Sequence, residues 1–141
     1  MAFRRYRGKT KTAWLPVTAS TTFSKGAIVA FASGYLIEAT SSTAALSHVG
    51  VIKKAILSSD ADYADARKVP VEVPLDKFVE WEGDVTSGLV AADVGLLVDL
   101  TDANTINRGA STIDAAQVTG VISSTKGLFR LNLGGSTGMI T

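Results

Sequence analysis

The chain has 141 residues, a formal net charge of +1 and 46% hydrophobic residues. This length suits one domain, or two small repeats that share a core, and it needs no disulfides to fold. The absence of cysteine excludes thiolate chemistry, and a single histidine leaves little for transition-metal binding. No apolar run reaches the length of a membrane helix or a signal-peptide core, so we expect a soluble protein or a component of an assembly.

Basic residues are concentrated at the N-terminus. Five cations and no acid occur in the first eleven residues. The candidate partner-binding residues in this segment are Arg4, Arg5, Tyr6, Arg7, Lys9 and Lys11. We therefore predict a basic N-terminal arm over residues 1–12 on a mildly acidic domain. Docking on a protein surface and simple disorder fit this arm equally well, and nucleic acid fits it less well because the rest of the chain is acidic.

Short β-branched or alternating runs predict strands along most of the remaining chain, and helical periodicity is nearly absent. The predicted strands are residues 27–31, 69–73, 78–81, 96–100, 118–122 and 128–133. Turn-forming residues separate them, and Gly34 and Gly127 have the positions of hairpin glycines. The segment 58–68 is either a short helical insert or a long exposed loop. We expect one β domain over residues 13–133, followed by a glycine-rich tail over 134–141.

Two halves of this domain share a pattern of glycines and apolar runs. VGVI at 49–52 returns as TGVI at 119–122, and KGAIVAF at 25–31 resembles VGLLVDL at 94–100. Aligning their glycines requires a single one-residue insertion. The resulting copies are about 24–83 and 88–133. We predict a small β-barrel or β-sandwich built from this degenerate internal repeat, while irregular recurrence of hydrophobic runs, common in all-β proteins, is the alternative.

The sequence offers little for catalysis. His48 is the only histidine, and its neighbour Ser47 would point to the opposite face of a strand, which argues against a Ser-His-Asp triad. The segment 60–71 begins like a calcium loop but lacks the glycine and the closing glutamate that such a loop requires. We therefore expect a protein that is not an enzyme and that has no catalytic residue, cofactor or metal site.

The order of these elements resembles that of bacteriophage capsid decoration, or cement, proteins. The resemblance rests on a glycine and apolar strand at 25–31, YLIEAT at 35–40, VGVI at 49–52 and VPVEV at 69–73. The first copy is similar to the lambdoid head-decoration family, and a related cement group carries the motif more than once, which matches both copies. The second copy has INR at 106–108 in place of the EAT step, and the N-terminus is more basic than the family pattern.

The resemblance implies a virion protein on the outer capsid surface, where it binds the major capsid protein at capsomer junctions and stabilises the head. It also implies a homotrimer at three-fold or quasi-three-fold positions. The six N-terminal residues would then contact the capsid or a neighbouring subunit through charge-assisted hydrogen bonds. We expect neither a membrane nor a specific nucleic acid as a partner.

Two other binding roles remain open. A carbohydrate- or host-surface-binding β module would use Trp14, Tyr35 or Trp81 as a stacking platform, provided that these rings are exposed. Trp14 and Trp81 stand in matching segments of the two copies, however, which favours packing in a shared core or interface. A structural component of a tail or connector fits the same composition.

Overall fold

The computed structural model describes residues 3–44, 47–86 and 88–133, whose regular structure is almost entirely β. The strands are β1 (Arg4–Arg7), β2 (Thr10–Pro16), β3 (Ile28–Ala32), β4 (Tyr35–Glu38), β5 (His48–Ile52), β6 (Lys68–Pro74), β7 (Glu80–Val85), β8 (Leu97–Asp102), β9 (Thr105–Asn107), β10 (Ala116–Ser123) and β11 (Lys126–Leu131). One short 3-10 helix, η2 (Ala91–Asp93), precedes β8. The predicted all-β class is confirmed, and the predicted tail at 134–141 lies outside the described residues.

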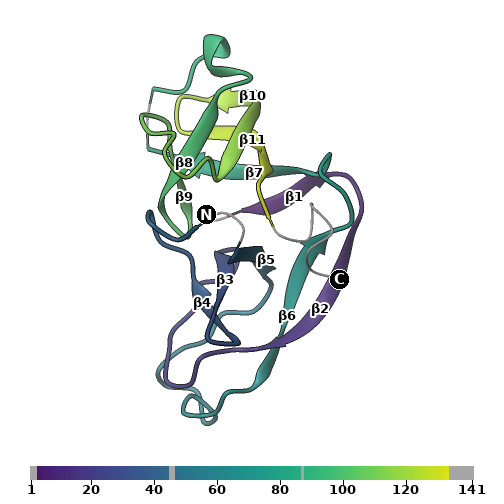
Figure 1. Cartoon of the computed structure of the whole chain (residues 1–141), viewed down its shortest axis with the longest axis vertical. Coiled ribbons are helices and arrows are strands. Elements are labelled where there is room, and N and C mark those ends of the chain that lie inside the picture. The colour runs from purple at the N-terminus through teal and green to yellow at the C-terminus, as the bar shows by residue number, and fades with distance from the viewer. Residues whose placement is uncertain (1–2, 45–46, 87, 134–141) are drawn as a thin grey trace.

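Strands β2 to β6 and strands β7 to β11 form two units with the same topology (Figure 1). In the second unit the sheet order is β7-β11-β10-β8-β9, and a parallel pairing between β7 and β9 closes a five-stranded barrel. In the first unit the order is β2-β6-β5-β3-β4, with each strand number lower by five. The edge strands of the first unit meet at one parallel bridge between Val17 and Leu36. The predicted internal repeat is therefore present as a repeated strand arrangement.

Gly26 and Gly95 occupy equivalent positions in the two units, as the sequence alignment predicts. Each precedes the second strand of its unit with a positive φ, 86° for Gly26 and 97° for Gly95, a conformation that favours glycine. Each donates its backbone N–H to a carbonyl oxygen at 2.8 Å, that of Ile52 in the first unit and that of Val118 in the second. Ile52 and Val118 are therefore equivalent as well.

The two GVI glycines, which suggest the repeat in the sequence, are not equivalent in the structure. Counting back from the matched pair Ile52 and Val118, Gly50 corresponds to Ala116, and Gly120 lies four residues further along. Each structural unit also begins one strand earlier than the sequence copies, at β2 and at β7. The duplication is thus present in the topology, but the motif alignment is out of register in its second half.

Each unit encloses a hydrophobic core, and the two cores are in contact. Ile28 and Val51 of the first unit pack with the core of the second, and Ala103 of the second packs with the core of the first. A backbone hydrogen bond of 2.9 Å from the Ile28 N–H to the Ala103 carbonyl oxygen joins the units. Strand β5 is consequently buried along its whole length and β3 along most of it, whereas β8 and β10 keep one face partly exposed.

The two tryptophans have different environments. Trp81 in β7 is fully buried, whereas 62% of the Trp14 surface is exposed. Trp81 pairs with Phe129 of β11, and the equivalent pair in the first unit is Ala13 with Val71 of β6. The sequence favours packing in a shared core or interface for both tryptophans, and packing in the core holds for Trp81 alone.

The described N-terminal residues do not extend away from the domain as an arm. β1 pairs antiparallel with β7 of the second unit, and β2 pairs with β6 of the first. The Phe3 side chain is buried against Gly83, where any Cβ atom would clash with its ring. The extended arm predicted over residues 1–12 is therefore not confirmed, because this segment adds a strand to each unit.

The segment 58–68 contains no helix: residues 58–67 form a loop with consecutive turns, and Lys68 begins β6. The Tyr63 hydroxyl donates a hydrogen bond to the Ser20 carbonyl oxygen, and the Ser20 N–H donates to the Tyr63 carbonyl oxygen, both at 2.9 Å. Arg67 forms ion pairs with Asp60 and Asp62. The two acids that resemble the start of a calcium loop are therefore both paired with one arginine of the same chain.

Gly50 allows β5 and β6 to approach each other closely, because a Cβ atom at this position would clash with the Glu72 carbonyl oxygen. We predict that Gly50→Ala lowers the free energy of unfolding by about 2 kcal/mol or more, since the strands must move apart. Gly109→Ala is the matched control, because its nearest heavy atom would lie 3.5 Å away. Urea unfolding measures both variants, and equal midpoints for the two would contradict the close approach.

Candidate functional site

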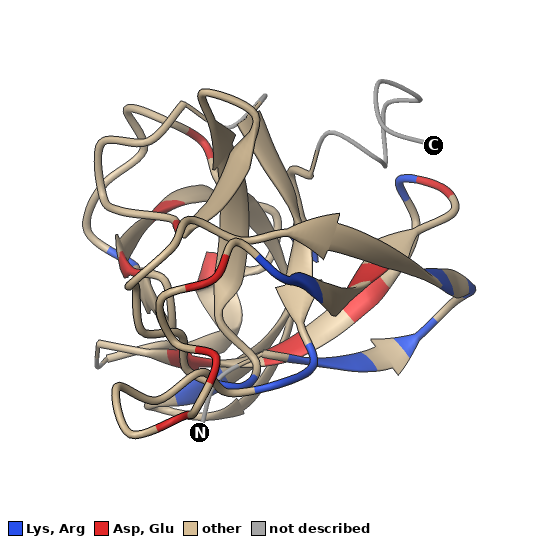
Figure 2. Ribbon diagram, turned by 90° about the horizontal axis from the view of Figure 1, so that it is seen from below, with Lys and Arg blue, Asp and Glu red and all other residues tan. Residues whose placement is uncertain are grey.

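The arginines of β1 are paired with glutamates of the same chain. The three pairs join β1 to β6 and β7: Arg4 with Glu82 at 3.0 Å, Arg5 with Glu72 at 3.4 Å, and Arg7 with Glu80 at 3.5 Å. Figure 2 shows blue and red segments next to one another at this end of the molecule. The arginine side chains are about half exposed or more, so each pair contributes roughly 0–1 kcal/mol and mainly positions β1. The carboxylates that we expect on a partner are thus present within the chain.

The other three predicted partner-binding residues form no ion pair with the described residues. About half of the Tyr6 surface is exposed, and the Arg7 guanidinium lies 5.5 Å from the centroid of its ring. Lys9 is exposed in the turn between β1 and β2, whereas Lys11 is half-buried on β2. The structure therefore places Tyr6 and Arg7 at the end of β1, Lys9 in the turn that follows, and Lys11 on β2.

The β1–β2 turn lies against the loop that connects β6 to β7. The Leu75 N–H donates to the Lys9 carbonyl oxygen at 3.0 Å, and Gly8 is in close contact with Val79. In this loop, Leu75 is 54% exposed and Phe78 is 58% exposed. We define the corner surface as Tyr6, Lys9, Leu75, Lys77 and Phe78. Three of its side chains, those of Tyr6, Leu75 and Phe78, are large, apolar and about half exposed.

Cations surround the aromatic ring at the edge of the corner surface. The Lys77 ammonium lies 5.4 Å and the Arg130 guanidinium 5.2 Å from the centroid of the Phe78 ring. Contacts of this kind stabilise an exposed ring in one position by roughly 0.5–1 kcal/mol each. Apolar area with positive charge around it is complementary to a partner surface that carries apolar residues and carboxylates.

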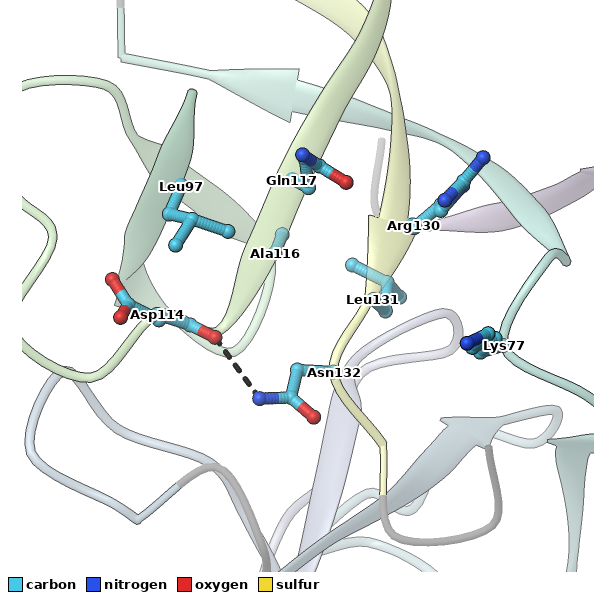
Figure 3. A pocket seen from close by; sticks show the side chains of 8 residues that line it. All are labelled: Lys77, Leu97, Asp114, Ala116, Gln117, Arg130, Leu131 and Asn132. Atoms are coloured by element: carbon cyan, nitrogen blue, oxygen red, sulfur yellow. Dashed lines mark hydrogen bonds between the residues drawn. The ribbon is translucent and has the colours of Figure 1, made fainter. Parts of the chain in front are cut away.

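A pocket of about 430 Å³ adjoins the corner surface. Figure 3 shows Lys77 and Arg130 on one side of it, Leu97 and Asp114 on the other, and Gln117 between them. Gln117 of β10 pairs with both Leu97 of β8 and Arg130 of β11, so three adjacent strands supply this face. The Nε of Arg130 and the Oδ1 of Asp114 are buried without a hydrogen-bond partner among the described residues. The pocket is amphipathic, because both apolar and polar side chains line it.

His48 lies inside the first unit and is not available as a general base. It is fully buried, and neither ring nitrogen makes a hydrogen bond of regular geometry to a described residue. Burial lowers the pKa of His48 to about 4, and the backbone of Thr43 offsets this effect only in part. The Ser47 hydroxyl donates to the Ala44 carbonyl oxygen at 2.7 Å and does not engage the imidazole. The nucleophile–base pair of a triad is therefore not formed.

The buried carboxylates of the second unit organise its loops. Asp99 accepts hydrogen bonds of 2.7–2.8 Å from the three backbone N–H groups of residues 112–114. Asp93 accepts two from the Arg108 guanidinium and one from the Val90 N–H, and these bonds, above all those from Arg108, lower the pKa of Asp93. Across the described ranges, no cluster of three or more His, Asp or Glu side chains has the arrangement of a metal site.

Exposed aromatic rings also occur on the first unit. Trp14 is 62% exposed on β2, and Tyr35 is 45% exposed on β4. These strands meet at the bridge between Val17 and Leu36. Both rings are accessible for stacking on a ligand, whereas Trp81 is not.

Comparison with known proteins identifies no family. No protein-family model and no curated protein matches the chain. The resemblance to decoration proteins therefore remains a prediction from the sequence. In the part of the chain that the structure describes, no helix has the length and apolar character needed to cross a membrane.

The sequence predictions do not include Leu75 and Phe78 of the corner surface, or Leu97 of the pocket, as site residues. Leu75 and Phe78 stand in LDKF at 75–78, which is typical of the end of one strand and the start of the next. Leu97 follows a second leucine in the VGLLVDL segment, and β alternation with the buried Val98 places it outside the barrel. This leucine pair is a signal from which the outward side chain could be predicted.

We predict that acidification from pH 6.5 toward pH 4 destabilises the fold through His48. The unfolded chain binds the imidazole proton with a pKa near 6.5 and the folded protein with a pKa of about 4, so the unfolded state binds more protons within this window. The free energy of unfolding therefore falls by about 3 kcal/mol as the pH is lowered across the window, and this group has no effect above it.

The matched variant is His48→Leu, which removes this titration and places an apolar side chain in the buried position. Chemical unfolding of both proteins at several pH values between about 7.5 and 4 gives the difference in stability between them. The free energy of unfolding of the variant should rise relative to that of the wild type as the pH falls. A constant difference across the series would contradict the role of His48.

Proposed function

We propose that this protein is a capsid decoration protein that binds the outside of a bacteriophage capsid at capsomer junctions and stabilises the head. The corner surface carries this proposal, because it places three exposed apolar side chains among cations on a chain whose single histidine is buried. The proposed partner is the major capsid protein, and the proposed location is the outer surface of the virion. The resemblance of the sequence to cement proteins supports the same role.

The ion pairs of β1 support docking in an indirect way. Arg4, Arg5 and Arg7 are paired with glutamates of the same chain, and these pairs hold β1 in place. Tyr6 of β1 and the turn that follows are therefore positioned before a partner binds. A preorganised aromatic anchor loses little conformational entropy on binding. When many copies bind a repeating lattice, avidity makes the overall attachment much stronger than each single contact.

Co-sedimentation with capsids assembled from the major capsid protein of the same genome tests this proposal. We expect Tyr6→Ala and Phe78→Ala each to weaken attachment by about tenfold or more, because exposed aromatic side chains are typical anchors of an interface. Leu57→Ala is the matched control, since Leu57 is 56% exposed in a different loop. A protein that does not bind these capsids at any concentration would refute the decoration role.

The salt dependence of attachment distinguishes docking by apolar contacts from docking by the arginines of β1. Attachment should persist in about 1 M salt, because ion pairs between exposed groups are screened under these conditions and apolar contacts are not. Attachment that is lost in salt but unchanged in the Phe78→Ala variant would assign docking to the cations of β1 instead.

A carbohydrate- or host-surface-binding module is the second candidate, and the exposed rings of Trp14 and Tyr35 favour it. In that case a glycan array should detect a ligand, and Trp14→Ala should weaken its binding by about tenfold, since a stacked ring contributes roughly 1–3 kcal/mol. Phe78→Ala should leave glycan binding unchanged. Absence of glycan binding together with capsid attachment would exclude this second role.

A further inference from the structure

Equivalent faces of the two units differ in what covers them. In the first unit, Ala27 and Ile28 follow the matched glycine Gly26 and are fully buried. In the second unit, their equivalents Leu96 and Leu97 are 47% and 49% exposed. The same position in the same topology is therefore inside the molecule in one unit and at its surface in the other.

The neighbouring strands show the same contrast. Val51 of β5 is 3% exposed, whereas its equivalent Gln117 of β10 is half-buried on the outer face. Each pairs with a charged residue of the next strand, Glu72 in the first unit and Arg130 in the second. We define the Leu97 face as Leu97, Gln117 and Arg130, and it forms part of the pocket in Figure 3.

A turn of the second unit covers the face in the first. The two residues between β8 and β9 form this turn, and its Ala103 is buried and accepts the hydrogen bond from the Ile28 N–H at 2.9 Å. The equivalent turn of the first unit lies between β3 and β4, and it is exposed. Tyr35 ends this turn and is 45% exposed. Among the described residues, the face of the second unit thus lacks the cover that its equivalent has in the first unit, and the β3–β4 turn of the first unit is exposed.

We infer that the Leu97 face is an interface between copies of this chain, in which the β3–β4 turn of a second copy packs on the Leu97 face of the first. The contact would continue between chains the arrangement that already joins the two units within one chain. Leu97 supplies apolar area, and the pocket beside it has room for the Tyr35 ring of the second copy. Gln117 and Asn132, which also line the pocket, would supply polar contacts at its edge.

This interface joins two different surfaces and is therefore heterologous. Repeating it generates a closed ring when the rotation between copies closes, and an open chain otherwise. The inference is independent of the proposed capsid role, because it concerns only contacts of this chain with itself.

Sedimentation velocity of the purified protein over a concentration series tests the interface. We expect the wild-type protein to associate as its concentration rises, and Leu97→Glu and Tyr35→Glu each to weaken association by about 100-fold or more, because either change places a charge in the interface. Leu57→Glu is the matched control and should associate like the wild type. Leu97 and Tyr35 are about half exposed, so the variants should keep the wild-type unfolding midpoint.

Mixing the two variants tests the turn-to-face arrangement. The Leu97→Glu chain keeps an intact turn and the Tyr35→Glu chain keeps an intact face, so a mixture should form a dimer with one of each and nothing larger. A wild-type protein that stays monomeric up to about 1 mM would overturn the inference, because the dissociation constant of the contact would then exceed about 1 mM. Association that survives either substitution, or a mixture that forms no dimer, would overturn it as well.

Discussion

The hydrogen bond from the Ile28 N–H to the Ala103 carbonyl oxygen crosses the surface where the two β units meet. Each unit is a small set of short strands, and a domain of that size buries too little surface for more than marginal stability. Contact between the units removes a second face of β3 and β5 from water and joins Ile28 and Val51 to the core of the second unit. The fold therefore depends on one unit serving as the cover of the other.

The N-terminal segment strengthens this dependence. Phe3 is buried, and its N–H donates to the Gly26 carbonyl oxygen of the first unit at 2.9 Å, while β1 immediately afterwards pairs with β7 of the second unit. β2 then returns to pair with β6 of the first. A few residues thus tie both units together, and the glutamates opposite β1 give its arginines a role in the fold before any partner is considered.

Local sequence predicts the strands well and their partners poorly. β alternation and turn glycines are local signals, so the β class, the repeat and the pair Gly26 and Gly95 are recognisable from the sequence. Register is not local, and a short apolar string such as GVI matches itself at several offsets, which is why Gly50 and Gly120 align in sequence and not in space. The predicted arm fails for a related reason, because its paired glutamates lie more than sixty residues away along the chain.

In a tandem of two similar units, some surfaces have no matching surface in the same chain to cover them. If a turn of the second unit covers a face of the first, the face of the second and the turn of the first have no counterpart in the same chain. Such surplus surface can be made polar without cost to the fold, and Gln117 is polar where Val51 stands in the first unit. Leu97 and Tyr35 keep large, mainly apolar side chains, although each is about half exposed, Leu97 beside the pocket and Tyr35 at the β3–β4 turn. An apolar side chain on the uncovered face and another at the exposed turn favour an interface over chance exposure.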